Sequence, residues 1–300
     1  MAEATMSSTQ ATSVPLIDVR KGPSLWQRYR KHKMAVIGLV FMILVVIMAV
    51  FAPWLGTIDP TKTSLMDSLK PPSSAHWLGT DLSGRDVWSR IAYAARASLI
   101  AGVVSTLIAS VIAVILGTVS GYYGGIIDNV IMRVTDVIMC IPDLIIIMAL
   151  VSVLGPGLLN VVIAIGILGW TGKTRLLRAQ ILAVREKEYV TAARCSGASN
   201  RRIMLRHILP NSFSPLLVAG TLSVAGAILT EASLSFLGFG ILPPSPSWGE
   251  MLNAARSFTR LQENPWIWMP PGIMILLTVL AINFIGDGLR DSLDPRQKER

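Results

Sequence analysis

Few residues in this 300-residue chain have the type and spacing that chemistry requires. Three histidines, His32, His76 and His207, lie far apart and lack neighbours at the spacing of a metal site. Of the two cysteines, Cys140 lies in an apolar segment and Cys195 in a basic one, so nothing indicates a disulfide. The sequence therefore predicts no metal and no cofactor.

The tripeptide Gly172-Lys173-Thr174 has the ending of a phosphate-binding loop. Such a loop needs a further glycine, separated from the second one by four residues, so that backbone N–H groups can cradle phosphates. Ile167 occupies that position, and Gly166 is one residue too far away. No strand pattern precedes the tripeptide, and we predict that the chain does not bind ATP itself.

Asp143 is a carboxylate inside a strongly apolar segment, directly after Pro142. A charged side chain inside a membrane is costly, so it is a functional candidate by default. Asp143 could line a water-filled path and meet a charged end of a transported molecule. It could equally cap backbone N–H groups at a kink made by the proline, and the sequence leaves both interpretations open.

The elements that position these residues are predicted to be membrane spans. Hydrophobic residues make up 52% of the chain and charged residues only 15%, which is typical of a polytopic membrane protein. The net charge of +9 would also suit a nucleic-acid binder. However, the basic residues lie beside apolar segments without interleaved aromatics, so we expect a lipid membrane around the chain and no nucleic acid.

Six apolar stretches are long enough to span a membrane. Both ends and the stretch 173–210, which has nine basic residues against two acidic ones, are then cytoplasmic by the positive-inside rule. We predict a 1–33 N-terminal tail, a first span at 34–54, an external loop at 55–96, a five-helix core at 97–290 and a 291–300 tail. The later spans are expected near residues 97–120, 130–154, 158–177, 211–231 and 266–286.

The stretch 173–210 lies between two apolar segments and is too long for a turn. Tyr189, Ala192 and Ala193 have helical spacing before Gly197, and apolar residues resume that spacing after it. This pattern predicts two short helices hinged at Gly197, with small side chains that a groove on another protein could approach closely. The alternative is a basic loop that only fixes topology.

A resemblance to a known motif favours the docking interpretation. The pattern from Ala192 to Pro210 resembles the cytoplasmic coupling motif of bacterial ABC importer permeases. Thr191 replaces the glutamate of that motif and His207 replaces an isoleucine, so Glu188, one helical turn earlier, is the candidate carboxylate. The resemblance implies that an ATPase subunit contacts Glu188, Tyr189, Ala192, Ala193, Gly197, Ala198, Leu209 and Pro210.

Three further blocks, at residues 76–102, 233–249 and 286–296, resemble the smaller permease subunit of the dipeptide, oligopeptide and nickel branch of these importers. The resemblance implies an all-α, type I ABC importer permease fold in the inner membrane, with a coupling helix between spans four and five. It also implies a non-catalytic subunit with four kinds of partner: a second homologous permease in a heterodimer, two ATP-binding subunits, an external substrate-binding protein and a peptide substrate.

A secondary transporter or channel driven by an ion gradient is the alternative. Such proteins need ionisable groups near the membrane midplane, often in repeated halves. The sequence offers only Asp143 as a deep carboxylate, with Glu231 towards the end of a span, and shows no internal repeat. A membrane enzyme has even less support, because no arrangement of histidine, serine or paired carboxylates suits catalysis.

Three local predictions complete the interpretation. Gly117 and Gly121 form a small-residue pair that lets helix backbones meet. Arg133 and Asp136, one turn apart, are expected to neutralise each other. Residues 233–252 are apolar but interrupted by glycine and proline, so we expect a re-entrant segment or one that a partner covers.

Overall fold

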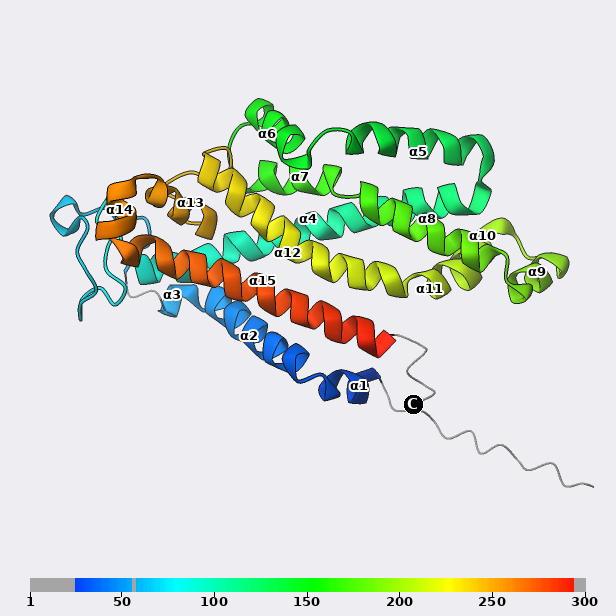
Figure 1. Ribbon diagram of the computed structural model, residues 1–300, viewed down its shortest axis with the longest axis horizontal. Coiled ribbons are helices and arrows are strands. Elements are labelled where there is room, and N and C mark those ends of the chain that lie inside the picture. Colours follow the sequence, from blue (N-terminus) through cyan, green and yellow to red (C-terminus); the bar gives the residue numbers. More distant parts are fainter. Residues whose placement is uncertain (1–24, 56–57, 294–300) are drawn as a thin grey trace, which may run out of the picture.

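The computed structural model describes residues 25–55 and 58–293, and within these ranges the chain has helices and no strands. The predicted all-α class is therefore confirmed. Residues 1–24 of the predicted N-terminal tail and most of the predicted tail 291–300 lie outside the described residues. The long helices lie side by side along the length of the molecule (Figure 1).

Four helices are long and apolar enough to cross a membrane: Lys33–Val50, Val87–Tyr123, Asn200–Leu237 and Pro265–Leu293. The first, second and fourth are α2, α4 and α15. The third is composed of α10 (Asn200–Arg202), a π-helical turn (Ile203–Ile208), α11 (Leu209–Ser212) and α12 (Ser214–Leu237). A short helix, α1 (Leu25–Lys31), precedes α2. It belongs to the predicted N-terminal tail and packs against α15.

The predicted third span is broken. It consists of α5 (Gly125–Met139) and α6 (Asp143–Leu154), which are bent by 86°. The break falls at Pro142, because proline lacks the N–H that would continue the helix and its ring clashes with the preceding turn. Counted as one span, this bent pair gives the described chain a fifth candidate.

The predicted fourth span is also divided, into α7 (Leu158–Leu168) and α8 (Thr171–Arg185), which are separated at Gly169 and Trp170. Neither helix alone reaches the length of a membrane crossing. The six-span topology therefore stays a prediction. Gly172, Lys173 and Thr174 lie in the first turn of α8 rather than in a loop.

Helix α4 begins at Val87, ten residues before the predicted start of the second span. Its N-cap is Asp86, whose carboxylate accepts a hydrogen bond from the backbone N–H of Ser89 at 2.8 Å. The charged residues Arg90 and Arg96 favoured the prediction of a loop here, but both side chains form hydrogen bonds within the fold. The loop predicted at 55–96 therefore ends before α4, at residue 86. It follows α3 (Ala52–Leu55) and contains a 3₁₀ turn at Leu65–Asp67.

Helix α4 is the central element, and it packs against α2, α7, α8 and α12. Its predicted small-residue pair lies against α8. An added Cβ at Gly121 would lie 2.9 Å from the Cβ of Ile181, and one at Gly117 would lie 3.1 Å from the carbonyl oxygen of Thr174. The prediction that helix backbones meet at this pair is confirmed.

The predicted pairing of Arg133 with Asp136 is not formed. Asp136 of α5 instead bonds to Arg175 of α8, and Asp128 accepts two hydrogen bonds from Arg178 at 2.5 and 2.6 Å. Helix α8 lies alongside α5 and presents a row of guanidinium groups, so the carboxylates find partners across the helix pair rather than along their own helix.

The segment 233–252 turns back against its own chain. Helix α12 ends at Leu237, and Gly238 has a left-handed φ of 88°, which reverses the chain direction. The segment then enters α13 (Trp248–Asn253), followed by a 3₁₀ turn (Ala254–Arg256) and α14 (Phe258–Glu263). Trp248 is fully buried and donates to the carbonyl of Ile91 in α4 at 3.3 Å, so this chain itself provides the cover for the segment.

Candidate functional site

Helix α9 (Glu188–Cys195) lies at the opposite end of the molecule from α13 and α14 (Figure 1). One side of it is anchored in the fold. Val190 is fully buried in an apolar cluster with Ile181 of α8 and Ile203 of the π-helical turn. Ala193 and Ala198, both half-buried, pack against the same cluster, so the position of α9 follows that of α8 and of the helix that leads into α12.

The other side of α9 is exposed. We call the residues Glu188, Tyr189, Ala192 and Gly197 the α9 face, because all four are exposed. Glu188 lies in the first turn of the helix, where a carboxylate complements the helix dipole. Tyr189 is 45% exposed. The α9 face therefore presents one carboxylate and one aromatic ring beside a surface of very small residues.

Gly197 ends α9 in a left-handed conformation with φ of 75°. Its N–H bonds to the carbonyl of Arg194 at 3.0 Å, and the N–H of Ala198 bonds to that of Ala193 at 3.2 Å. A Cβ added at Gly197 would meet no atom within 4 Å. The left-handed backbone conformation explains why this residue is glycine. Packing within this chain does not, because the space where a Cβ would lie is empty.

The second helix of the predicted hinge is not a short, separate helix. It begins at Asn200 and continues through Pro210 towards α12. Side chains satisfy carbonyls near the proline: Asn211 donates to His207 at 2.6 Å and Ser212 donates to Ile208 at 3.0 Å. The π-helical turn and these bonds let the helix pass Pro210 without a break.

The eight predicted coupling residues do not all share one surface. The α9 face unites four of them, while Ala193, Ala198 and Leu209 are half-buried anchors in the apolar cluster. Pro210 is exposed on the following helix.

Two contacts that sequence reasoning missed tie this region to the end of α4. Tyr122 donates to the side-chain oxygen of Asn200 at 2.7 Å, and Arg185 donates to the carbonyls of Gly121 and Tyr122 at 3.3 and 3.2 Å. The partners are 63 to 78 residues apart, so no local pattern could have paired them.

Asp143 lies at the first position of α6, and its carboxylate has no hydrogen-bond partner among the described residues. The capping interpretation is thus not realised in this structure. Its exposed carboxylate lines a cavity of about 230 Å³ together with Lys173, Thr106 and Ser223. The cavity lies between α4, α6, α7, α8 and α12.

Glu231, the other carboxylate considered for ion coupling, is fully buried. It accepts hydrogen bonds from Ser235 at 2.7 Å and from Ser98 of α4 at 3.3 Å. These hydroxyls tie α12 to α4, and this arrangement gives Glu231 a structural role.

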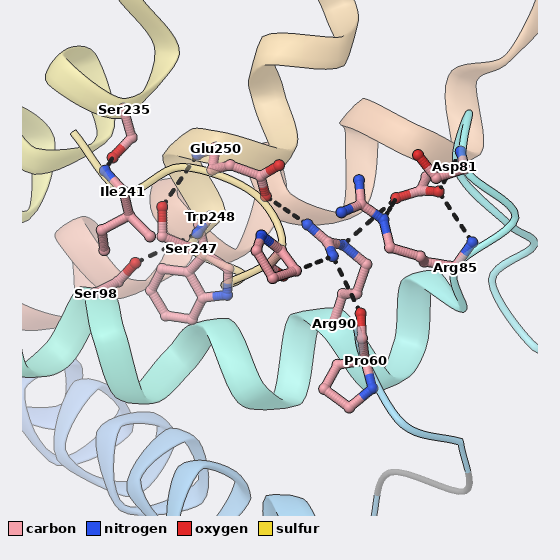
Figure 2. Close-up of polar contacts among 12 residues, drawn as sticks. Pro60, Asp81, Arg85, Arg90, Ser98, Ser235, Ile241, Ser247, Trp248 and Glu250 are labelled. Atoms are coloured by element: carbon pink, nitrogen blue, oxygen red, sulfur yellow. Dashed lines mark hydrogen bonds and ion pairs between the residues drawn. The ribbon is translucent and has the colours of Figure 1, made fainter. Parts of the chain in front are cut away.

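A buried ion cluster at the end with α13 was also missed by sequence reasoning (Figure 2). Nε of Arg85 donates to Oδ2 of Asp81 at 2.7 Å, and Nε of Arg90 lies 3.6 Å from the same oxygen. Nη2 of Arg90 donates to Oε2 of Glu250 at 2.5 Å. The cluster joins the loop before α4, α4 itself and α13.

Backbone carbonyls complete the environment of Arg90. Its Nη1 donates to Pro60 at 3.1 Å and to Pro244 at 3.4 Å. Burial raises the pKa of Glu250, and the positive charge of Arg90 opposes that shift. Arg90 is only 1% exposed, so Glu250 and the two carbonyls take the place of water around its guanidinium group. These bonds hold the segment 58–86 against the helices.

Comparison with known proteins identifies the family. Residues 109–299 match the family described as "binding-protein-dependent transport system inner membrane component". Residues 24–72 match the family described as "N-terminal TM domain of oligopeptide transport permease C". The chain belongs to this family of ABC permeases. It is accordingly an inner membrane transport protein, and the resemblance drawn from its sequence is confirmed.

Individual relatives cover nearly the whole chain. The dipeptide transport system permease protein DppC of Alkalihalophilus pseudofirmus is 40% identical over 98% of this chain and 97% of its own length. The oligopeptide transport system permease protein OppC of Bacillus subtilis is 40% identical over 93% and 92%. The glutathione transport system permease protein GsiD of Escherichia coli is 42% identical over 91% and 90%.

The fold has a solved counterpart. The inward-facing MetNI methionine ABC transporter contains a chain that aligns with a TM-score of 0.56 at 16% identity. The alignment covers 68% of this chain and 97% of that one. At this identity the likeness shows the fold alone.

Proposed function

We propose that this protein is one of two homologous permease subunits of an ATP-driven importer of di- or oligopeptides. Its relatives are permeases of transport systems named for dipeptides, oligopeptides and glutathione, which are all peptides or built like them. The second permease would complete the path along the cavity at Asp143, and an external binding protein would deliver the substrate. The chain itself would carry out no chemical step.

The α9 face is the observation that carries this proposal. A coupling element must be exposed to its partner yet fixed to the helices that it moves. The α9 face meets the first condition, and the burial of Val190 against Ile181 and Ile203 meets the second. Closure of two ATP-binding subunits would push on α9, and the continuous chain from Asn200 to Leu237 would transmit the displacement into α12.

We further propose that both termini and the α9 face are cytoplasmic. Impermeant thiol reagents can test this in intact cells, after the exposed Cys140 and Cys195 have been replaced by alanine. Met66→Cys, at a residue that is 92% exposed, should label from outside, whereas Glu186→Cys, whose side chain is 73% exposed, should label only after the cells are opened. Labelling of both from outside would overturn the topology.

The transport role is tested by uptake in a strain from which this chain has been deleted. Restoring the chain should restore uptake of labelled dipeptides, and ATP depletion should abolish that uptake. A protonophore should leave it unchanged at constant ATP, whereas inhibition by the protonophore would favour the ion-gradient alternative. Purification through a tag on this chain should recover a second permease and two ATP-binding subunits.

A further inference from the structure

The cavity at Asp143 contains two unpaired charges of opposite sign. It measures about 230 Å³ and is lined from α4, α6, α8 and α12. A neighbouring cavity of about 340 Å³ shares Asp143, Lys173 and Ser223 with it. Asp143 and Lys173 therefore line both spaces.

Lys173 is a buried cation that lacks an anionic partner among the described residues. Its side chain is 8% exposed, and Nζ donates one hydrogen bond, to the carbonyl of Gly169 at 3.0 Å. An ammonium group has three donors, so two remain for a ligand. Burying a charge without a counter-charge is costly unless an anion or water compensates it.

Asp143 provides the complementary charge without neutralising Lys173. No ion pair within 4.0 Å joins it to any basic group in the part of the chain that the structure describes. Its carboxylate also has no hydrogen-bond partner among the described residues. Both oxygens are thus available to accept hydrogen bonds from a cationic group.

Thr106 supplies a further polar group that is free to bind a ligand. It is 7% exposed, it lines the cavity, and its hydroxyl has no hydrogen-bond partner within the described residues. The hydroxyls of Ser105, Ser223 and Thr230 in the same lining already donate to backbone carbonyls, at 3.1, 2.7 and 2.9 Å. Among these four hydroxyls, only that of Thr106 is free to donate a hydrogen bond to a ligand.

We propose that this cavity binds both charged ends of a short peptide during translocation. Asp143 accepts hydrogen bonds from the terminal ammonium, Lys173 donates to the terminal carboxylate, and Thr106 donates to a carbonyl between them. Opposite charges that the fold holds apart suit a zwitterion, whose own charges are separated by its peptide backbone. This inference rests on the proposed peptide-import function and adds that the permease itself selects free termini.

The test uses the purified assembly of permeases and ATP-binding subunits in lipid nanodiscs, without the external binding protein. Equilibrium binding is measured for alanyl-alanine, for its N-acetyl derivative and for its C-terminal amide. In the native complex, each blocked peptide should bind at least tenfold more weakly than alanyl-alanine. Asp143→Asn should weaken alanyl-alanine about tenfold and leave the acetylated peptide unchanged. Lys173→Gln should weaken alanyl-alanine and leave the amide unchanged.

Two control variants separate recognition from folding. Lys173→Arg keeps the cation and should keep the preference for a free carboxylate. Ser152→Ala removes only a hydroxyl of α6 that lies outside both cavities and is bonded to its own helix, so it should leave all three affinities unchanged. Recovery of the full assembly establishes that each variant folds. Equal weakening of all three peptides in Asp143→Asn or Lys173→Gln, unchanged affinities, or no binding by the native complex would each overturn this inference. Uptake that is still restored by the chain would leave the proposed function standing.

Discussion

The two ends of the molecule are built in opposite ways. At the end with α13, charged groups are buried and paired within the chain: Arg90 is 1% exposed and bonds Glu250 across 160 residues of sequence. At the other end, the α9 face is exposed and rests on an apolar anchor at Val190. At the first end, residues of this chain pair with the buried charges. At the second end, the α9 face has no cover from the described residues.

Glycine shows the same contrast. A Cβ at Gly249 of α13 would lie 2.4 Å from Cα of Ala232, so two backbones touch there. A Cβ at Gly197 would touch nothing. Packing within the chain explains the first glycine, whereas only the backbone conformation explains the second. We expect substitutions at the buried contacts of the end with α13 to lower stability, and we propose that those on the α9 face weaken association with the ATP-binding subunits.

The largest effect is expected at the ion cluster. Arg90→Met leaves Glu250 buried without its counter-charge, which costs roughly 3–5 kcal/mol of folding stability. Unfolding of the detergent-purified protein should therefore shift to much lower denaturant concentration. The double variant Arg90→Met, Glu250→Leu should recover most of the loss, and a double variant as unstable as the single one would contradict the assignment.

A smaller loss is expected where α13 meets α12. Gly249→Ala forces a methyl group against the backbone of Ala232 and should cost about 1–3 kcal/mol. Gly226→Ala is the matched control, because a Cβ there meets nothing within 4 Å and alanine favours a helix. Equal stability of the two variants in the same unfolding assay would show that the backbones do not touch as described.

Neighbouring residues on α9 should separate anchoring from docking. Val190→Ala removes buried contacts and should lower stability by roughly 1–2 kcal/mol. Tyr189→Ala changes an exposed ring and should alter stability by less than about 0.5 kcal/mol, yet weaken recovery of the ATP-binding subunits. If Tyr189→Ala instead destabilised the fold and left recovery unchanged, the α9 face would not be a docking surface.

Patterns close together in the sequence predicted well. Apolar length located four helices long enough to cross a membrane, although two other predicted spans are broken. The spacing of small residues located the place on α4 where another helix backbone comes close and the helix that ends at Gly197. The proline at 142 was noticed, but a local pattern gives no angle, so the 86° bend was not predicted. The charges of Arg90 and Arg96 concealed the start of α4, because a lone sequence does not show that buried partners neutralise them.

Contacts between distant segments were not predictable from the sequence. Glu250 lies 160 residues from Arg90, and Asn200 lies 78 residues from Tyr122. Asp136 had a plausible partner one turn away but bonds instead to Arg175, 39 residues further along the chain. For Asp143, the sequence left the capping and pathway interpretations open; the capping bond is not formed among the described residues, and the pathway role stays a proposal.

The coupling role of the α9 face is tested most directly by Gly197→Leu against Gly238→Leu. Both glycines have left-handed φ, 75° and 88°, and a Cβ meets nothing within 4 Å at either, so both variants carry a similar backbone strain of about 1–2 kcal/mol. They lie at opposite ends of the molecule, at the C-termini of α9 and α12. The measurement is co-purification of the ATP-binding subunits with the tagged chain from membranes that contain equal amounts of each variant. We expect Gly197→Leu to lose these subunits and Gly238→Leu to retain them; full retention by Gly197→Leu would contradict the account.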